Sequence, residues 1–304
     1  MSFTDRFLVL AADPDEPDVL SKLTAFRSFL LMHIGVEAVL GFHATLAGRP
    51  ESPYPEIQLL LWLAVTLACL VGIASHWARG ATTVVCGLWI VDALLVFPST
   101  ANHTFIEVVC LIAFVFLDLR KSGERAVLRQ TLGWFFVIVL VYTGVQKVLY
   151  NTYFDGQMLG VLIAEEDRFA WFFQWILSSD EFNRLRALGP IPTEWGQALP
   201  EGAYRIDSIP VVMLSNATYV LEMLLPILLL VPRMRSLAIT GIVLLILAIE
   251  IGAREITFGA LAMNLVLLFA KRDWNRRLLP FFAVLYAGLV VLRIVGGGWF
   301  EFVI

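Results

Sequence analysis

The sequence predicts an all-α protein: a polytopic membrane helix bundle of about nine transmembrane helices, with an interfacial or re-entrant helical segment on the outer side. Of the 304 residues, 59% are hydrophobic, and the mean hydropathy is +0.79. Only 16% are charged, whereas soluble domains carry about 25%. The apolar residues form long uninterrupted runs, which is typical of membrane-spanning helices.

Nine apolar runs of about 16–25 residues are candidates for spanning or near-spanning helices. They cover residues 23–47, 57–77, 80–98, 103–119, 131–150, 211–231, 236–254, 255–270 and 278–297. The seventh and eighth runs are separated only by Arg254 and Glu255. Because that break is so short, this boundary is the weakest of the set.

The chain is expected to have a short N-terminal segment, residues 1–22, in the cytoplasm or at the interface, followed by one transmembrane domain, residues 23–304. Phe7–Ala12 is too short for the apolar core of a signal peptide, and an acidic stretch follows it. The longest break between runs, residues 151–210, contains the aromatic segment Phe169–Leu177. That segment is too short to span a bilayer, so it suits an interfacial or re-entrant helix.

The distribution of basic residues predicts the orientation. The connections after the fourth, sixth and eighth runs are basic, and they contain Arg120, Lys121, Arg125, Arg129, Arg233, Arg235, Lys271, Arg272, Arg276 and Arg277. The connections of opposite parity are nearly free of Lys and Arg. The positive-inside rule then places the N-terminus inside and the C-terminus outside, with residues 151–210 outside, in what we expect to be a bacterial inner membrane. Because the net charge is −4 and the basic residues lie in short loops, no nucleic-acid partner is expected.

Most polar residues within the predicted helices fall in the outer half of the membrane under this topology. They are Lys147, Asn102, His103, Glu107, Glu250, Arg254, Glu255 and His43. Asp92 and Glu222 are expected near mid-depth, and His33 pairs with Glu37 at i,i+4. A lysine costs roughly 2.5–3.5 kcal/mol near the bilayer centre. The one-sided distribution predicts a cavity that opens to the outer face or to lipid.

The cysteines give no sign of a metal site or of a disulfide. Cys69, Cys86 and Cys110 all lie inside apolar runs, without the spacing of metal ligands. We interpret them as small core residues, and no metal is expected from the sequence.

Several of these polar residues lie in short motifs that resemble the HTTM (horizontally transferred transmembrane) family, best known from vitamin K-dependent gamma-glutamyl carboxylases. The motifs are Tyr142–Lys147 followed by Tyr153–Gly156, the segment Ala101–Phe105, the weaker Ala25–Arg27, and Glu222 with Pro226, Pro232 and Arg235. The resemblance covers roughly residues 20–270.

The resemblance implies a site for vitamin K hydroquinone or a related quinol. Lys147 would remove the proton of the hydroquinone, and Asn102 and His103 would handle the quinone. Glu107 lies on the same helix face as His103 and would orient it. Gly144, Tyr150 and Glu250 complete the expected cofactor-binding residues, and O2 and CO2 would be co-substrates of a carboxylase.

Two departures from the family pattern limit this expectation. The family usually has a histidine in the helix at about residues 240–254, where this chain offers only Glu250 as a polar substitute. The soluble domain with which the animal carboxylase recognises its propeptide has no counterpart before Ile304. Quinol chemistry is therefore a stronger expectation than propeptide-dependent carboxylation of a peptide.

Three functional hypotheses remain open from the sequence. The resemblance favours a membrane enzyme that couples quinol epoxidation to carboxylation or another modification of a substrate such as a peptide. The chain would alternatively be a non-catalytic accessory subunit for peptide maturation, export or immunity. A proton-coupled transporter is disfavoured because the inner half has few polar residues. The bland interpretations are that Lys147 extends to the interface and that Glu107 and Glu222 bond neighbouring helices.

Overall fold

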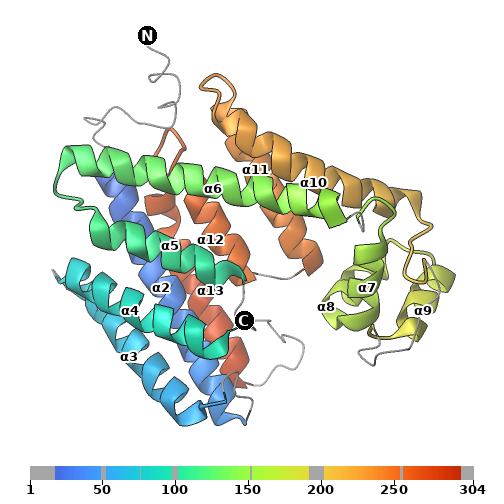
Figure 1. The fold of residues 1–304 in the computed structure, drawn as a ribbon, viewed down its shortest axis with the longest axis horizontal. Coiled ribbons are helices and arrows are strands. Elements are labelled where there is room, and N and C mark those ends of the chain that lie inside the picture. Colours follow the sequence, from blue (N-terminus) through green and yellow to red (C-terminus); the bar gives the residue numbers. More distant parts are fainter. Residues whose placement is uncertain are drawn as a thin grey trace. The chain divides into compact units, whose positions relative to one another are not determined.

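The computed structural model describes residues 18–48, 53–75, 77–97, 102–150, 153–191, 202–253 and 256–295, and every regular element in these ranges is an α-helix (Figure 1). The helices are α2 (Asp18–Leu46), α3 (Pro55–Ala74), α4 (Ala78–Val96), α5 (Asn102–Phe116), α6 (Ser122–Tyr150), α7 (Gln157–Glu165), α8 (Asp167–Phe173), α9 (Ser179–Leu188), α10 (Ile209–Leu229), α11 (Arg235–Ala253), α12 (Ile256–Leu267) and α13 (Trp274–Val295). The predicted all-α class is confirmed.

Among the described residues, seven helices are long and apolar enough to cross a membrane: α2, α3, α4, α6, α10, α11 and α13. This number is compatible with a multi-pass membrane protein. The expected count of nine is not confirmed, because the fourth and eighth runs form helices of only 15 and 12 residues. At a rise of about 1.5 Å per residue, 12 residues reach about 18 Å, well short of a hydrocarbon core of about 30 Å.

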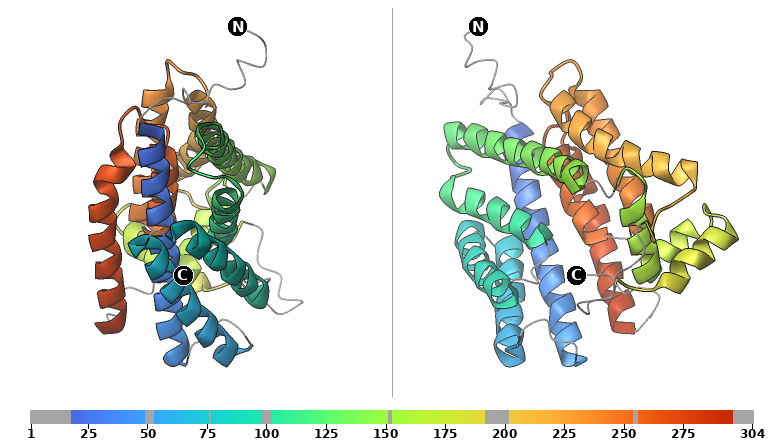
Figure 2. Two further views of the ribbon diagram at one scale, coloured as in Figure 1. Left: turned by 90° about the vertical axis from the view of Figure 1, so that its left-hand side faces the viewer. Right: turned by 45° about the vertical axis from the view of Figure 1, so that its right-hand side comes forward.

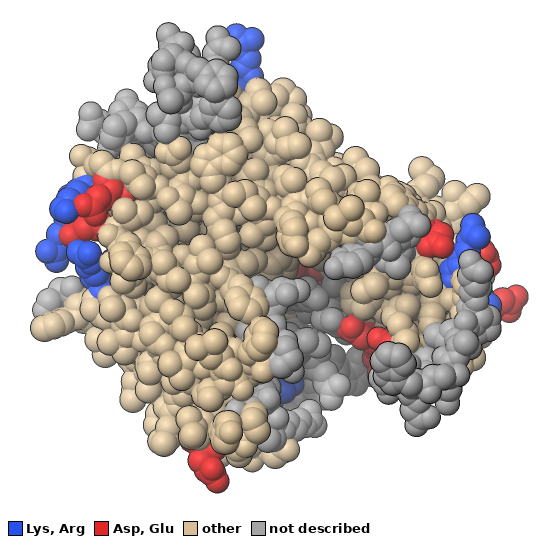
Figure 3. Space-filling view, viewed as in Figure 1, with Lys and Arg blue, Asp and Glu red and all other residues tan. Residues whose placement is uncertain are grey.

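The outer faces of the long helices are covered with large apolar side chains. Leu60 and Leu94 are each 70% exposed, and Val284 is 73% exposed. Figure 3 shows a broad face without charged groups, with the Lys, Arg, Asp and Glu side chains gathered in a few patches at its margins. Such a surface is costly in water and suits a lipid environment.

The described residues divide into two compact units. The first comprises residues 1–135 and 260–304. Within it α2 packs against α3 and α13, and α4 packs against α3 and α5 (Figure 2). Aromatic rings fill the contact between α2 and α13, where Phe29 lies edge-to-face on Phe282 at 5.2 Å. The helix at the start of the chain is therefore buried by the last helix of the described chain.

The second unit comprises residues 136–259. It contains the C-terminal half of α6, the adjacent pair α10 and α11, and the short helices α7–α9. The short helices and the start of α10 share a hydrophobic core of Ile163, Phe169, Phe173, Leu177, Leu185, Ile206 and Val211. We call residues 153–191 the helical insert.

The aromatic segment Phe169–Leu177 forms α8 and the turns after it rather than one nine-residue helix. Phe169 and Phe173 are buried in the core of the helical insert, whereas Trp175 is 77% exposed. One face of the segment thus holds the insert together, and the other is free to meet a membrane interface or a partner. Trp195 lies outside the described residues.

Candidate functional site

A lysine–carboxylate pair joins α6 and α10 in the second unit. The Lys147 ammonium donates to both carboxylate oxygens of Glu222, at 2.5 Å to Oε1 and 2.7 Å to Oε2. The Glu222 side chain is 6% exposed and that of Lys147 is 20% exposed. Because both helices are apolar, this ion pair has little contact with solvent, and only the Lys147 side chain is partly accessible.

The packing around this pair explains the small residue one turn before the lysine. A Cβ added to Gly144 would lie 2.5 Å from Met223 Cγ and 3.0 Å from the carbonyl oxygen of Tyr219. The two helix backbones therefore approach closely at Gly144, as glycines allow in membrane helices. The close approach of the two helices explains why a glycine lies at position 144. The contact of Gly144 with a quinol remains a prediction.

Aromatic side chains border the same place. Lys147 Nζ lies 5.3 Å from the centre of the Tyr153 ring, within the range of a cation–π contact. The backbone carbonyl of Tyr153 accepts a hydrogen bond from Ser215 Oγ at 2.8 Å, which ties the start of the helical insert to α10. Phe154 lies edge-to-face on Tyr219 at 5.4 Å. The lysine therefore faces aromatic rings as well as its carboxylate partner.

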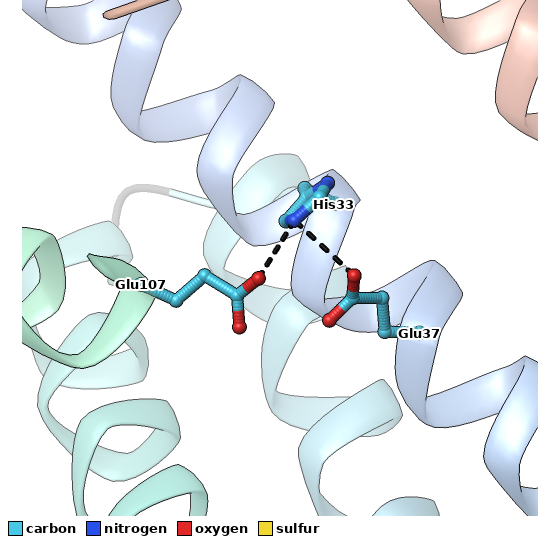
Figure 4. A group of neighbouring side chains, drawn as sticks. All are labelled: His33, Glu37 and Glu107. Atoms are coloured by element: carbon cyan, nitrogen blue, oxygen red, sulfur yellow. Dashed lines mark hydrogen bonds and ion pairs between the residues drawn. The ribbon is translucent and has the colours of Figure 1, made fainter. Parts of the chain in front are cut away.

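A second group of polar side chains lies in the first unit, and we call it the histidine–carboxylate cluster: His33, Glu37, His103 and Glu107. His33 Nε2 is 2.8 Å from Glu107 Oε1 and 3.4 Å from Glu37 Oε1 (Figure 4). His103 Nε2 is also 3.4 Å from Glu37 Oε1. The side chains of His33 and Glu107 are 0% exposed, that of Glu37 is 2% exposed and that of His103 is 13% exposed.

Neighbouring side chains hold this cluster in place. Tyr286 Oη lies 2.5 Å from His33 Nδ1, and Trp89 Nε1 donates to Glu107 Oε2 at 2.7 Å. One edge of His33 and one oxygen of Glu107 are thus occupied by partners from α13 and α4. The remaining ring nitrogen, His33 Nε2, and the remaining carboxylate oxygen, Glu107 Oε1, lie close to each other and to Glu37.

The sequence-predicted site residues divide between the two units. Lys147, Gly144 and Glu250 lie in the second unit, while His103 and Glu107 lie in the first. The close neighbours of His103 and Glu107 are within their own unit, with Glu37 the carboxylate beside His103. The expected contact of Lys147 and His103 with one quinone stays a prediction.

The remaining predicted residues are placed less fully. Asn102 is the first residue of α5 and Tyr150 the last of α6, and their side chains lie outside the description. Glu250 packs against a glycine, since a Cβ at Gly259 would lie 2.2 Å from Glu250 Oε1. Arg254, Glu255 and Ala101 lie outside the described residues.

Sequence reasoning undervalued two parts of these sites. Glu222 was expected at mid-depth as a helix-bonding residue, yet it is the partner of Lys147. The sequence predicts a His33–Glu37 pair on one helix, and in the structure this pair meets a second pair with the same spacing on α5. The signal was present in the sequence as two His-x-x-x-Glu motifs, His33–Glu37 and His103–Glu107.

The turn before α6 contains an exposed group of charges outside the spanning helices. The backbone N–H of Arg120 donates to Asp118 Oδ1 at 2.9 Å, and Arg79 pairs with Asp118 Oδ2 at 2.9 Å. These contacts lower the pKa of Asp118, the backbone hydrogen bond most of all. Its neighbour Lys121 has a raised pKa because it donates to Glu124 at 2.6 Å.

Comparisons with protein-family models, with characterised proteins and with solved structures find no match to this chain.

Proposed function

We propose that this chain is a multi-pass membrane enzyme that takes a proton from a quinol, with Lys147 as the base and Glu222 as the group that keeps Lys147 ready to act. The observation that carries the proposal is the pair itself: Lys147 Nζ lies 2.5 Å and 2.7 Å from the two oxygens of a buried glutamate. Both residues belong to motifs that resemble the HTTM family.

The pair supports proton transfer because it has two protonation arrangements. In one, Lys147 is an ammonium and Glu222 a carboxylate. In the other, a proton has moved along the hydrogen bond to give an amine and a carboxylic acid. An apolar environment disfavours the ammonium–carboxylate form because it carries two charges. The free-energy difference between the charged and the neutral arrangement is therefore smaller than in water. The amine form of Lys147 accepts the proton of a phenolic hydroxyl and becomes an ammonium beside the protonated Glu222. The pair is reset when the proton on Glu222 leaves to water, which restores the ammonium and the carboxylate.

The residues present fit an aromatic, weakly acidic ligand. The Lys147 side chain is 20% exposed, so its amine is accessible from one side. Tyr153 offers a ring face beside it, at 5.3 Å from Nζ, and the surrounding helices are apolar. A quinol bound there would supply the electrons for reaction with O2, as the resemblance implies. Carboxylation, with CO2 as co-substrate, belongs to the same resemblance. We further propose a bacterial inner membrane with the N-terminus inside, an orientation that the distribution of basic residues favours.

The test is turnover by the purified protein in lipid nanodiscs with vitamin K hydroquinone. Wild type is expected to form the epoxide, and Lys147→Ala and Lys147→Met are expected to lose at least 100-fold of the rate, since general-base catalysis contributes about 10²–10⁴-fold. Glu222→Gln keeps the shape but cannot take the proton, so its rate should fall as well. Lys121→Met, which removes an exposed lysine, is the matched control and should leave the rate unchanged. Absence of both quinone binding and turnover in wild type would refute the proposal.

A second candidate, an accessory subunit for a peptide-processing partner, is favoured by the helical insert. The insert has its own hydrophobic core and presents Trp175 at 77% exposure. In this alternative Lys147→Met leaves function intact, whereas Trp175→Ala weakens capture of the partner. A cell-based assay with both variants separates the two candidates.

A further inference from the structure

We propose that the histidine–carboxylate cluster binds one divalent transition-metal ion, with His33, Glu37 and Glu107 as ligands and His103 as the fourth. The set comes from two helices with the same motif, His-x-x-x-Glu, on α2 and α5. One turn of helix separates the members of each motif, and the contact of the two helices brings four side chains together. Figure 4 shows three of them, His33, Glu37 and Glu107. This site is separate from Lys147 and does not depend on quinol chemistry.

The spacing of the ligand atoms suits an ion. His33 Nε2, Glu37 Oε1 and Glu107 Oε1 all lie within 4.8 Å of one another. Glu37 Oε1 is 3.4 Å from Nε2 of both histidines. Four donors held about 2.1 Å from one ion at tetrahedral angles are about 3.4 Å apart. The 2.8 Å contact of His33 with Glu107 is shorter than this, and a shift of a few tenths of an ångström would open it.

Glu37 supplies the independent sign that a ligand belongs here. Its side chain is 2% exposed, and its Oε1 is buried without a hydrogen-bond partner. A buried carboxylate oxygen without a hydrogen bond is costly. Nε2 of His33 and Nε2 of His103 both lie 3.4 Å from this oxygen. An ion bound between these atoms would give Glu37 Oε1 a direct partner.

Charge supports the same assignment. Glu37 and Glu107 are two carboxylates in an apolar interior, and among the described residues their ion pairs are with imidazoles, not with Lys or Arg. Two ionised carboxylates beside neutral imidazoles require a positive counter-charge. A divalent cation balances them, and mixed imidazole and carboxylate ligands favour Zn²⁺, Mn²⁺ or Fe²⁺ over Mg²⁺ and Ca²⁺.

The outer contacts are those of a supported metal site. Tyr286 lies on Nδ1 of His33, which leaves Nε2 for the ion, and Trp89 holds the second oxygen of Glu107. Partners of this kind fix the orientation of metal-bound imidazoles and carboxylates. With an ion on Nε2, the neutral His33 ring would carry its single proton on Nδ1 and donate it to Tyr286 Oη.

The experiment loads the purified full chain, stripped with chelator, with Zn²⁺ or with Co²⁺. Wild type is expected to retain one equivalent of Zn²⁺ by elemental analysis and to give the intense visible absorption of four-coordinate Co²⁺. Glu37→Gln and Glu107→Gln, which keep side-chain size, should lose this spectrum. Tyr286→Phe should weaken affinity by about 10–100-fold while retaining the spectrum, because it acts through His33.

Glu56→Gln is the control, since it makes the same change at an exposed glutamate of the same unit. It should bind Co²⁺ like wild type. Wild type without retained Zn²⁺ or a four-coordinate Co²⁺ spectrum would overturn the site, and this arm requires no variant to fold. Equal binding by wild type and Glu37→Gln would also overturn it, by placing the ion elsewhere. His103→Gln tests the fourth ligand: an unchanged spectrum would remove His103 from the set and leave it for the quinone.

Discussion

Lys147 and Glu222 form a two-oxygen ion pair although they are 75 residues apart and lie on different helices. Counting residues along the predicted helices placed Lys147 near the outer end of its helix and Glu222 near the middle of the membrane. The contact shows that they lie at the same level. Lys147 is therefore paired in the structure, whatever additional contact its partly exposed end makes with the interface.

The first prediction concerns the energetics of this pair. Glu222→Gln leaves an ammonium without its counter-charge in an apolar region and should lower the thermal unfolding temperature in detergent. Removing one partner of a fully buried pair costs roughly 3–5 kcal/mol, and the 20% exposure of Lys147 reduces that cost. The double variant Lys147→Met/Glu222→Leu should recover most of the loss. A double-mutant cycle with strictly additive effects would contradict the pair as a stabilising contact.

The second prediction concerns the close approach of α6 and α10. Gly144→Ala places a methyl group 3.0 Å from the carbonyl oxygen of Tyr219, which cannot move as a side chain can. The expected cost is about 1–3 kcal/mol, typical of overpacking. Gly87→Ala in α4 is the control, because nothing lies within 4 Å of its added Cβ. That variant should be neutral or slightly stabilising, and equal losses in both would argue against a specific contact at Gly144.

The third prediction tests the orientation. All three native cysteines are buried, so single cysteines introduced at exposed positions can be labelled selectively. In intact cells, a membrane-impermeant maleimide should label Ser179→Cys in the helical insert and leave Lys271→Cys unlabelled. Both positions are exposed in the structure. The reverse pattern would invert the topology deduced from loop charges.

The fourth prediction is a pH dependence at the turn before α6. The contacts of Asp118 with the backbone of Arg120 and with Arg79 lower its pKa. These contacts therefore stabilise the folded state above the ordinary aspartate pKa of about 3.9. That stabilisation is lost as the pH falls through the lower pKa that Asp118 has in the folded protein. Between pH 5 and pH 3, the thermal unfolding temperature of wild type should fall more steeply than that of Asp118→Asn. Parallel curves would show that the turn adds nothing to acid sensitivity.

The apolar runs in the sequence predicted where the helices lie, but they did not predict how long each helix is. Each of the nine apolar runs contains a helix, because hydrophobic composition and the absence of charges specify helices in a membrane. The expected count of spanning helices is not confirmed for α5 and α12, since an apolar run of 16 or 17 residues does not show where its helix begins and ends. Asn102 begins α5, and Ile256 begins α12. Both helices are too short to cross a bilayer alone.

Side-chain partners were beyond the reach of the sequence. The two His-x-x-x-Glu motifs can be read from the chain, but the pairing of His33 with Glu107 depends on how α2 and α5 pack. Tyr286 joins them from a helix 253 positions away. No periodicity predicts contacts of that range.

The sequence by itself determined the membrane class, the helical segments and the polar residues that are too costly in lipid to be incidental. Only the tertiary structure decided which side chains these residues contact: Lys147 contacts Glu222, and His33 lies with Glu37, His103 and Glu107. The physical reason is that hydropathy acts locally along the chain, whereas the partner of a buried charge is set by which helix faces meet. Apolar side chains define those faces only collectively.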